Sequence, residues 1–91
     1  LHYFSADWCG YCQMFNPKWD EIKEEYKNNK NIRLKKTVID DNNQHLLQMY
    51  QIQSFPSLIL VKGNGEQVPY SSDKRTKKDI REFLRENQSN V

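Results

Sequence analysis

Two cysteines with two residues between them, Cys9 and Cys12, constrain this chain more than any other feature, and they are its only cysteines. Three positions apart in the first turn of a helix, their side chains lie on one face and close enough to form a disulfide. The N-terminus of a helix favours an anion, so it stabilises the thiolate form of the first cysteine. The spacing therefore predicts a redox-active dithiol in which Cys9, at the exposed tip of the helix, is the attacking sulfur.

The length and charge of the chain limit the other possibilities. Its 91 residues suffice for one small domain with a buried core, but not for two. A disulfide between cysteines this close closes too short a loop to stabilise the fold much, which favours a reactive pair over a structural one. A formal net charge of +2 gives no basis for nucleic-acid binding. No apolar stretch approaches the roughly 20 residues of a membrane span, so we expect a soluble protein.

The pattern of apolar residues predicts an α/β fold with the order βαβαββα and a mixed four-stranded sheet flanked by helices. The expected strands cover about residues 1–5, 33–39, 57–61 and 66–70, and the expected helices begin near residues 9, 44 and 77. The first helix contains Pro17, which predicts a kink in one helix ending near Asn28 rather than two helices. Asp40 to Asn43 are expected to cap the second helix, and Thr76 with Asp79 the third.

Three features together resemble the thioredoxin superfamily. They are Trp8-Cys9-Gly10-Tyr11-Cys12 at the start of a helix, Pro17 inside that helix, and Phe55-Pro56 directly before an apolar strand. The resemblance covers residues 1–86 and includes features both of thioredoxin and of the catalytic domains of protein disulfide isomerases. It implies a thioredoxin fold, in a single domain over residues 1–91 that lacks the N-terminal strand and helix of complete thioredoxin.

The resemblance also implies a mechanism. The Cys9 thiolate would attack a disulfide of a protein substrate, and Cys12, shielded on the core-facing side of the helix, would resolve the mixed disulfide. Trp8 would form a flat apolar platform beside the sulfur, although plain packing would also explain a tryptophan at this position. Gly10 would let a substrate backbone approach Cys9, and its alternative role is to ease a tight helix start.

Members of this family bind substrates beside a proline at the position of Pro56. The resemblance implies that the Phe55-Pro56 bond is cis and faces the dithiol, and that the backbone of Phe55 pairs with an extended substrate. Together with Trp8, these two residues form the expected substrate-binding groove. Because backbone pairing depends little on side chains, we expect a broad range of protein substrates.

One position departs from the family pattern near the resolving cysteine, and a nearby lysine is affected by the change. Six residues before Cys9, where the family usually has a buried acid, this chain has Tyr3. A phenol is a poor base at neutral pH, so slow release of the mixed disulfide is expected. Lys36 aligns with the lysine that usually neighbours the acid. If Lys36 is partly buried, its pKa falls and its neutral amine could serve as the base. If it lies on an edge strand, its charge instead discourages pairing with a strand of another chain.

Tyr11 lies between the two cysteines, where thioredoxin has proline and disulfide isomerases have histidine. An imidazolium stabilises a thiolate by its charge, whereas a tyrosine hydroxyl is at most a weak donor. The predicted reduction potential is therefore intermediate between about −270 mV for thioredoxin and about −180 mV for protein disulfide isomerase.

A metal site and a pure binding domain are the alternatives to a redox enzyme. A pair of cysteines with this spacing can be half of a zinc site, but the other candidate ligands, His2 and His45, belong to different elements without ligand spacing. We therefore expect no metal and no cofactor other than the redox-active dithiol itself. The main alternative is a redox-inactive domain that binds peptides at Phe55-Pro56, and the intact cysteines and Trp8 favour the enzyme over it.

The expected partners are protein substrates with thiols or disulfides, and a reductase or oxidase that restores the dithiol. We expect the chain to be a monomer. The direction of electron flow depends on these partners and on the redox poise of the compartment, and the sequence does not determine it. The features shared with disulfide isomerases favour a secretory lumen over the cytoplasm.

Overall fold

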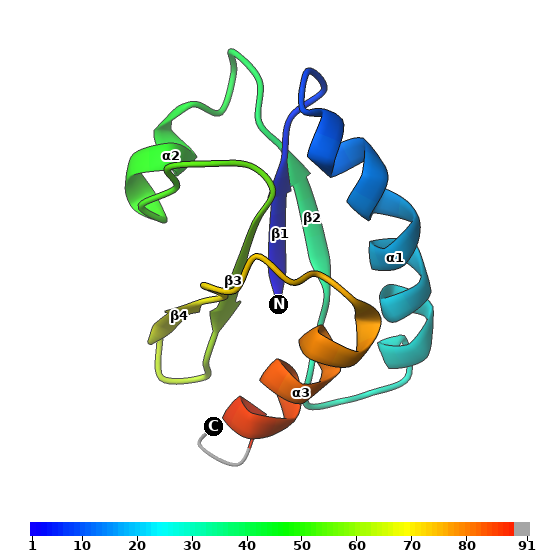
Figure 1. The fold of residues 1–91 in the computed structure, drawn as a ribbon. Coiled ribbons are helices and arrows are strands. Elements are labelled where there is room, and N and C mark those ends of the chain that lie inside the picture. Colours follow the sequence, from blue (N-terminus) through cyan, green and yellow to red (C-terminus); the bar gives the residue numbers. More distant parts are fainter. Residues whose placement is uncertain (89–91) are drawn as a thin grey trace.

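The computed structural model describes residues 1–88, and residues 89–91, at the end of the expected domain, lie outside this range. The described residues form four strands and three helices in the predicted order (Figure 1). These elements are β1 (His2–Ser5), α1 (Gly10–Tyr26), β2 (Lys35–Val38), α2 (His45–Met49), β3 (Ser57–Val61), β4 (Gln67–Pro69) and α3 (Lys77–Gln88). Among these described helices, none is long and apolar enough to cross a membrane.

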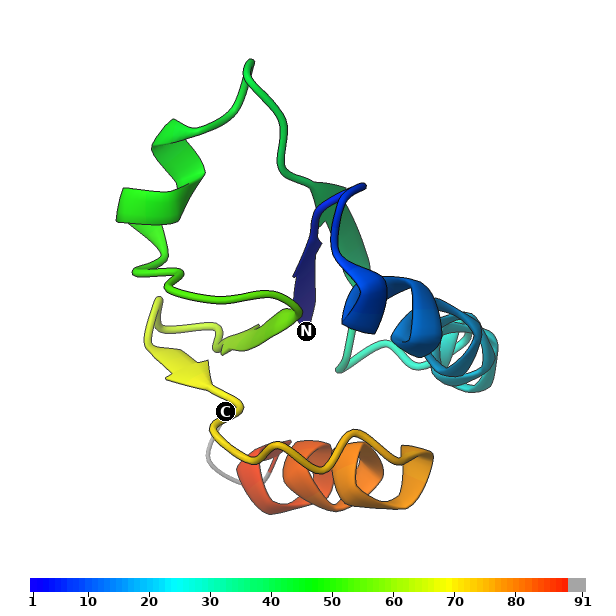
Figure 2. The same ribbon diagram turned by 45° about the horizontal axis from the view of Figure 1, so that its top comes forward.

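The strands form one mixed sheet in the order β2-β1-β3-β4, in which β1 and β2 are parallel and the other neighbours are antiparallel. Figure 2 shows, from a second side, that α1 and α3 lie on one side of the sheet and α2 on the other. The predicted mixed four-stranded sheet flanked by helices is therefore confirmed. β2 is an edge strand, and its exposed Lys35 and Lys36 discourage pairing with another chain.

Successive side chains of a strand point to opposite faces, so the sheet builds a core on each side. The larger core lies under α1 and α3 and comprises Leu1, Tyr3, Phe15, Trp19, Ile22, Ile32, Leu58, Leu60, Ile80 and Leu84. On the α2 side, Phe4, Ile39 and Ile59 form a smaller core. α1 buries one stripe of residues that recur every three or four positions, namely Cys12, Phe15, Trp19 and Ile22.

The helix boundaries follow the local sequence with one exception. α1 runs as one helix from Gly10 to Tyr26, with Pro17 inside it. The expected cap of α2 is wrong, because Gln44 directly precedes the helix and its side chain makes no capping hydrogen bond. Asn43 Oδ1 instead accepts a hydrogen bond from the Asp40 N–H at 2.8 Å, so these side chains stabilise the preceding turn.

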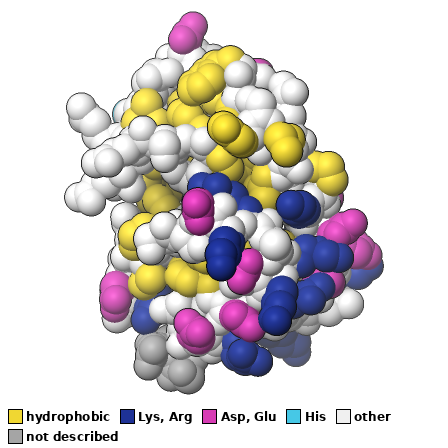
Figure 3. All heavy atoms as spheres, viewed as in Figure 1, with side chains coloured by type: hydrophobic (Ala, Val, Ile, Leu, Met, Phe, Trp, Pro, Cys, Tyr) yellow, Lys and Arg dark blue, Asp and Glu magenta, His cyan; other side chains and the backbone are white. Residues whose placement is uncertain are grey.

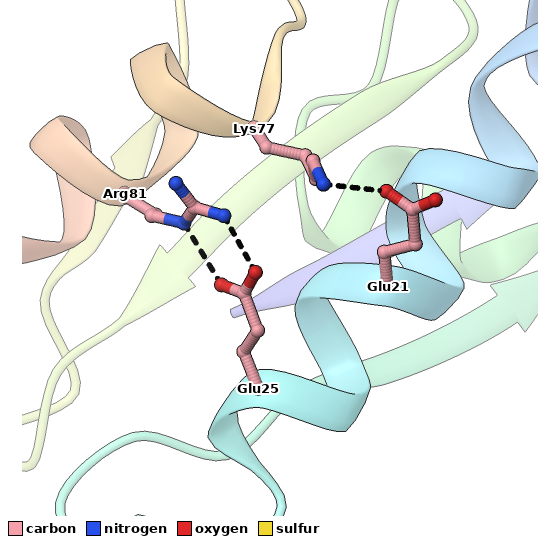
Figure 4. A network of polar contacts seen from close by, with 4 residues as sticks. All are labelled: Glu21, Glu25, Lys77 and Arg81. Carbon is pink, nitrogen blue, oxygen red and sulfur yellow. Dashed lines mark hydrogen bonds and ion pairs between the residues drawn. The ribbon is translucent and has the colours of Figure 1, made fainter.

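Polar contacts fix the start of α3 and its position along α1. Thr76 Oγ1 accepts a hydrogen bond from the Asp79 N–H at 3.1 Å, as a helix-capping threonine does. Ion pairs link the two helices, and they join Arg81 to Glu25 and Lys77 to Glu21 (Figure 4). The paired groups are partly exposed to solvent, so they contribute little free energy of folding and mainly align α3 with α1.

Candidate active site

The turn after β1 leads directly into α1 and places Cys9 at the N-cap of this helix. The Cys9 backbone is extended, and its Sγ accepts a hydrogen bond from the Cys12 N–H at 3.1 Å. A helix N-terminus leaves such N–H groups unpaired, so this donor stabilises negative charge on the sulfur. The expected exposure of the tip is wrong, because Cys9 is only 5% exposed and packs against Ala6 and Phe55.

Cys12 lies one turn further along α1, on the side that faces the core, and is fully buried. Burial raises the pKa of the Cys12 thiol, and its hydrogen bond with Cys9 raises it further, while contacts with the Ala6 backbone and Tyr3 lower it. Both cysteines are free thiols in this structure. Their surroundings differ, since an N–H donor stabilises negative charge on Cys9 and burial favours the protonated form of Cys12.

Aromatic residues and a cis proline border the dithiol. The Phe55-Pro56 bond is cis, and Phe55 packs against the cluster formed by Ala6, Cys9 and Cys12. The Trp8 ring is 78% exposed and meets Phe55 edge to face, with 5.5 Å between the ring centroids. A side chain that only packed against the fold would be more buried, so this exposure argues against packing as the sole role of Trp8. A Cβ added at Gly10 would meet no atom within 4 Å, so the fold itself leaves space for a side chain there.

Arg75 is a residue of this site that the sequence interpretation missed. It lies in the loop before α3, and its Nη2 donates a hydrogen bond to the Pro56 carbonyl at 3.2 Å. Its Nε is buried and has no hydrogen-bond partner within residues 1–88. In the sequence Arg75 stands among lysines at the start of a helix, a pattern typical of a solvated surface, and only the folded chain brings it to Pro56.

Comparison with known proteins identifies the family. The thioredoxin family profile matches residues 1–86. The chain belongs to the thioredoxin family. Protein disulfide-isomerase from Gallus gallus is 33% identical over 82 residues, which are 89% of this chain and 15% of the relative. Protein disulfide-isomerase 1 from Caenorhabditis elegans is 35% identical over 82 residues, which are 89% of this chain and 16% of the relative. The chain thus spans only a small part of the length of these relatives.

Solved structures of thioredoxin-family proteins show the same fold. The first thioredoxin domain of mouse protein disulfide-isomerase A4 has a TM-score of 0.77 at 26% identity, with 96% of this chain and 61% of that chain covered. The J-Trx1 fragment of ERdj5 has a TM-score of 0.81 at 24% identity, with 97% of this chain and 42% of that chain covered. The thioredoxin fold expected from the sequence is therefore confirmed.

Tyr3 occupies the position where the thioredoxin family usually has a buried acid, and it is fully buried. Its hydroxyl donates to Asn16 Oδ1 at 2.8 Å and lies 3.3 Å from the Cys12 carbonyl oxygen. Burial and the neighbouring Cys12 raise the pKa of Tyr3, so the phenol is a hydrogen-bond donor and not a base at neutral pH. The sequence interpretation missed Asn16. The one sequence feature that could have pointed to it is its position in a helix interior, where asparagine is unfavourable.

Lys36, which aligns with the lysine that usually neighbours this acid in the family, lies opposite Tyr3 in the register of β1 and β2. Its Nζ is 5.7 Å from the centre of the Tyr3 ring, within the range of a cation–π contact. Lys36 is exposed to solvent. The alternative in which burial makes its amine a neutral base is therefore wrong, and its place on an edge strand fits the protective role.

The two histidines have structural explanations. His2 Nε2 lies 2.7 Å from Thr37 Oγ1, and its ring stacks on Phe4. The pKa of His2 is lowered to about 4, mainly because burial disfavours the charged ring. His45 is exposed on α2. Within residues 1–88, no three or more side chains of His, Cys, Asp or Glu are placed to hold a metal ion.

Replacing Tyr3 with phenylalanine would keep the ring and remove the hydroxyl. We expect the pKa of Cys12 to rise further, because the Tyr3 hydrogen bond lowers it. We also expect the free energy of unfolding to fall by about 1 kcal/mol, because Asn16 loses its partner. The ultraviolet absorbance of the thiolate, followed in a pH titration of a Cys9→Ala background, measures the first effect.

Asn16→Ala is the matched control for this substitution. It removes the same hydrogen bond but keeps the Tyr3 hydroxyl, the group that lowers the pKa of the Cys12 thiol. We therefore expect a similar loss of stability without an increase in the pKa of Cys12. Equal titration curves with and without Tyr3→Phe, both in the Cys9→Ala background, would show that the hydroxyl does not act on this thiol.

Proposed function

We propose that this chain is a thiol–disulfide oxidoreductase domain, in which the Cys9–Cys12 dithiol exchanges with disulfides of protein substrates. The observation that carries the proposal is the hydrogen bond from the Cys12 N–H to Cys9 Sγ, with a second thiol buried directly behind the first. The similarity to protein disulfide-isomerases supports an activity of this class. Reduction, oxidation and isomerisation all use the same exchange, and the partners present determine which of them occurs.

In the reducing direction, the Cys9 thiolate attacks one sulfur of a substrate disulfide. A bond forms between Cys9 and the substrate, the substrate S–S bond breaks, and the other substrate sulfur leaves as a thiolate that takes up a proton. Cys12 then loses its proton and attacks Cys9 Sγ. The Cys9–Cys12 disulfide forms, the mixed disulfide breaks, and the second substrate sulfur leaves, so two electrons have passed from the dithiol to the substrate.

We propose that loss of the proton from the Cys12 thiol limits the rate of the second step. Burial raises the pKa of this thiol, so little thiolate is present at neutral pH. Tyr3, which replaces the usual acid, does not accept the proton under these conditions because its own pKa is also raised. Its hydroxyl instead supports the second step as a donor to the Cys12 thiolate, and the proton passes to solvent.

We further propose that an extended substrate binds beside Pro56, with its backbone paired to Phe55 and an apolar side chain placed on Trp8. The exposed Trp8 ring against Phe55 supports this, because it offers an apolar surface next to Cys9 that the fold itself does not use. The open space around Gly10 supports a close approach of the substrate backbone to the sulfur.

A redox-inactive peptide-binding domain is the second candidate, because the groove at Phe55-Pro56 does not itself require exchange chemistry. Insulin reduction by dithiothreitol, with and without the protein, separates the two functions. An oxidoreductase shortens the delay before reduced insulin precipitates, in proportion to its concentration. A delay that no amount of the protein shortens would reject the oxidoreductase.

Equilibration with a glutathione redox buffer is expected to give a reduction potential between about −270 mV and about −180 mV. The reason is Tyr11, which is exposed between the two cysteines and offers the Cys9 thiolate less support than an imidazolium would. The disulfide fraction at each buffer ratio is read from the mass of the alkylated protein. A potential outside these limits would mean that Tyr11 influences the dithiol in another way.

For the cellular setting, we propose a secretory lumen, with a reductase or oxidase as the redox partner of a monomeric domain. The named relatives support this compartment, since they are protein disulfide-isomerases, and disulfides form and persist in oxidising compartments. The dithiol itself is the only redox group that the proposed exchange needs.

A further inference from the structure

A groove of about 470 Å³ lies between α1 and the loop before α3. It is lined by Tyr11, Met14, Phe15, Lys18, Pro56, Asp73 and Arg75. Pro56 belongs both to this groove and to the proposed substrate site. A protein chain that is bound beside the dithiol can therefore continue directly into the groove.

Tyr11 and Met14 form an exposed apolar wall of this groove. They are 75% and 73% exposed, and they lie three positions apart on the outer side of α1. Figure 3 shows hydrophobic side chains gathered at the end of the molecule where α1 begins. Folding does not bury these two side chains, so an apolar side chain of a ligand would remove their surface from water and gain contact with both.

Basic side chains complete the groove. Lys18 follows Met14 by one helical turn and takes part in none of the ion pairs within residues 1–88. Arg75 closes the opposite side, and its Nε is buried without a hydrogen-bond partner in this part of the chain. Asp73 is the one acid in the lining, so the basic residues outnumber it by two to one. The groove therefore joins an apolar wall to a net positive charge.

We propose that this groove binds the segment of a substrate protein that flanks its reactive cysteine, and that it prefers an apolar residue next to an acidic one. The apolar side chain packs on Tyr11 and Met14, and the carboxylate pairs with Lys18 and Arg75. The inference rests on the proposed function and adds a side-chain preference to a site whose backbone pairing supplies none. Lys18 is then a specificity-determining residue.

Pairs of synthetic peptides test this preference. The two peptides of a pair contain the same disulfide and differ only in the flanking residues, Leu-Glu in one and Leu-Lys in the other. We expect the reduced protein to reduce the acidic peptide about threefold to tenfold faster in kcat/KM at low ionic strength. Added salt should shrink this difference, because it screens partly exposed charges.

Lys18→Glu is expected to abolish or reverse the preference for the acidic peptide. Lys23→Glu is the matched control, because it makes the same change of charge at another exposed position of α1 that does not line this groove. The control should keep the preference of the parent protein. A preference that Lys18→Glu leaves unchanged would overturn the inference.

Binding without chemistry separates this inference from the proposed function. The same peptides, with serine in place of both cysteines, bind without any exchange, and an NMR titration gives their affinities. If no peptide is reduced but the acidic peptide binds more tightly, the proposed function fails and the groove keeps its assignment. Equal affinities for the acidic and basic peptides would reject the groove, whether or not the protein reduces disulfides.

Discussion

Replacing Cys9 with serine is expected to slow catalysed disulfide reduction by about a thousandfold or more, because the variant has lost its attacking thiolate. A serine hydroxyl stays protonated at neutral pH and is a far weaker nucleophile than a thiolate. Serine is also a good helix N-cap, so its Oγ can still accept the hydrogen bond from the Cys12 N–H and the fold should persist. Insulin reduction measures the loss, and circular dichroism confirms that the variant is folded.

Cys12→Ser is the matched control for the attacking cysteine. It keeps Cys9 and its backbone donor, so the first attack still occurs and only the release step is lost. We expect a stable mixed disulfide between the protein and a substrate, visible by mass spectrometry under non-reducing conditions. A mixed disulfide that formed at Cys12 in the Cys9→Ser variant, at the rate of the parent protein, would reverse the assigned roles.

Replacing Trp19 with alanine is expected to lower the free energy of unfolding by about 3–5 kcal/mol. The indole is buried in the larger core, with its ring centroid 5.1 Å from that of Tyr3 and 6.4 Å from that of Phe15. Typical domains have a total stability of only about 5–15 kcal/mol, so this loss is a large share of it. A lower urea midpoint with an unchanged m value would show the effect.

Trp19→Phe tests whether the volume of the indole or its polar atom matters. The Trp19 Nε1 is buried and has no hydrogen-bond partner within residues 1–88. Phenylalanine removes this N–H, and the gain of about 1–3 kcal/mol from losing an unsatisfied donor offsets part of the cavity that forms. We expect a stability within about 1.5 kcal/mol of the parent protein. A loss as large as that of Trp19→Ala would contradict this account.

Features that depend on neighbouring residues could be predicted from the sequence. The helical period predicts that Cys9 and Cys12 lie one turn apart on α1. It also predicts which side of this helix is buried. The position of β2 at the edge of the described sheet agrees with its two exposed lysines, which are typical of an edge strand. In each case the deciding residues lie within one element or in its immediate pairing.

Features that depend on distant residues could not be predicted in this way. Cys9 is buried in a cluster against which Phe55 packs, and Phe55 comes from the loop before β3. The contact between Arg75 and Pro56 joins residues 19 positions apart and appears in the sequence only as part of a basic cluster. Asn16 gains its role from Tyr3 on another element. The period of apolar residues indicates which side of a helix or strand is buried. It does not indicate which residues from distant parts of the chain will contact that side.

The Tyr3 ring belongs to the larger core, and its hydroxyl belongs to the surroundings of the dithiol, so one side chain connects interior packing with sulfur chemistry. In a closed thermodynamic cycle, the stability gained or lost on oxidation equals the difference in disulfide free energy between the folded and unfolded chain. The reduction potential of the folded domain is therefore linked to the difference in folding free energy between its oxidised and reduced forms. An interior substitution changes the potential only when it destabilises one form more than the other, and Tyr3 lies where such an unequal effect is expected.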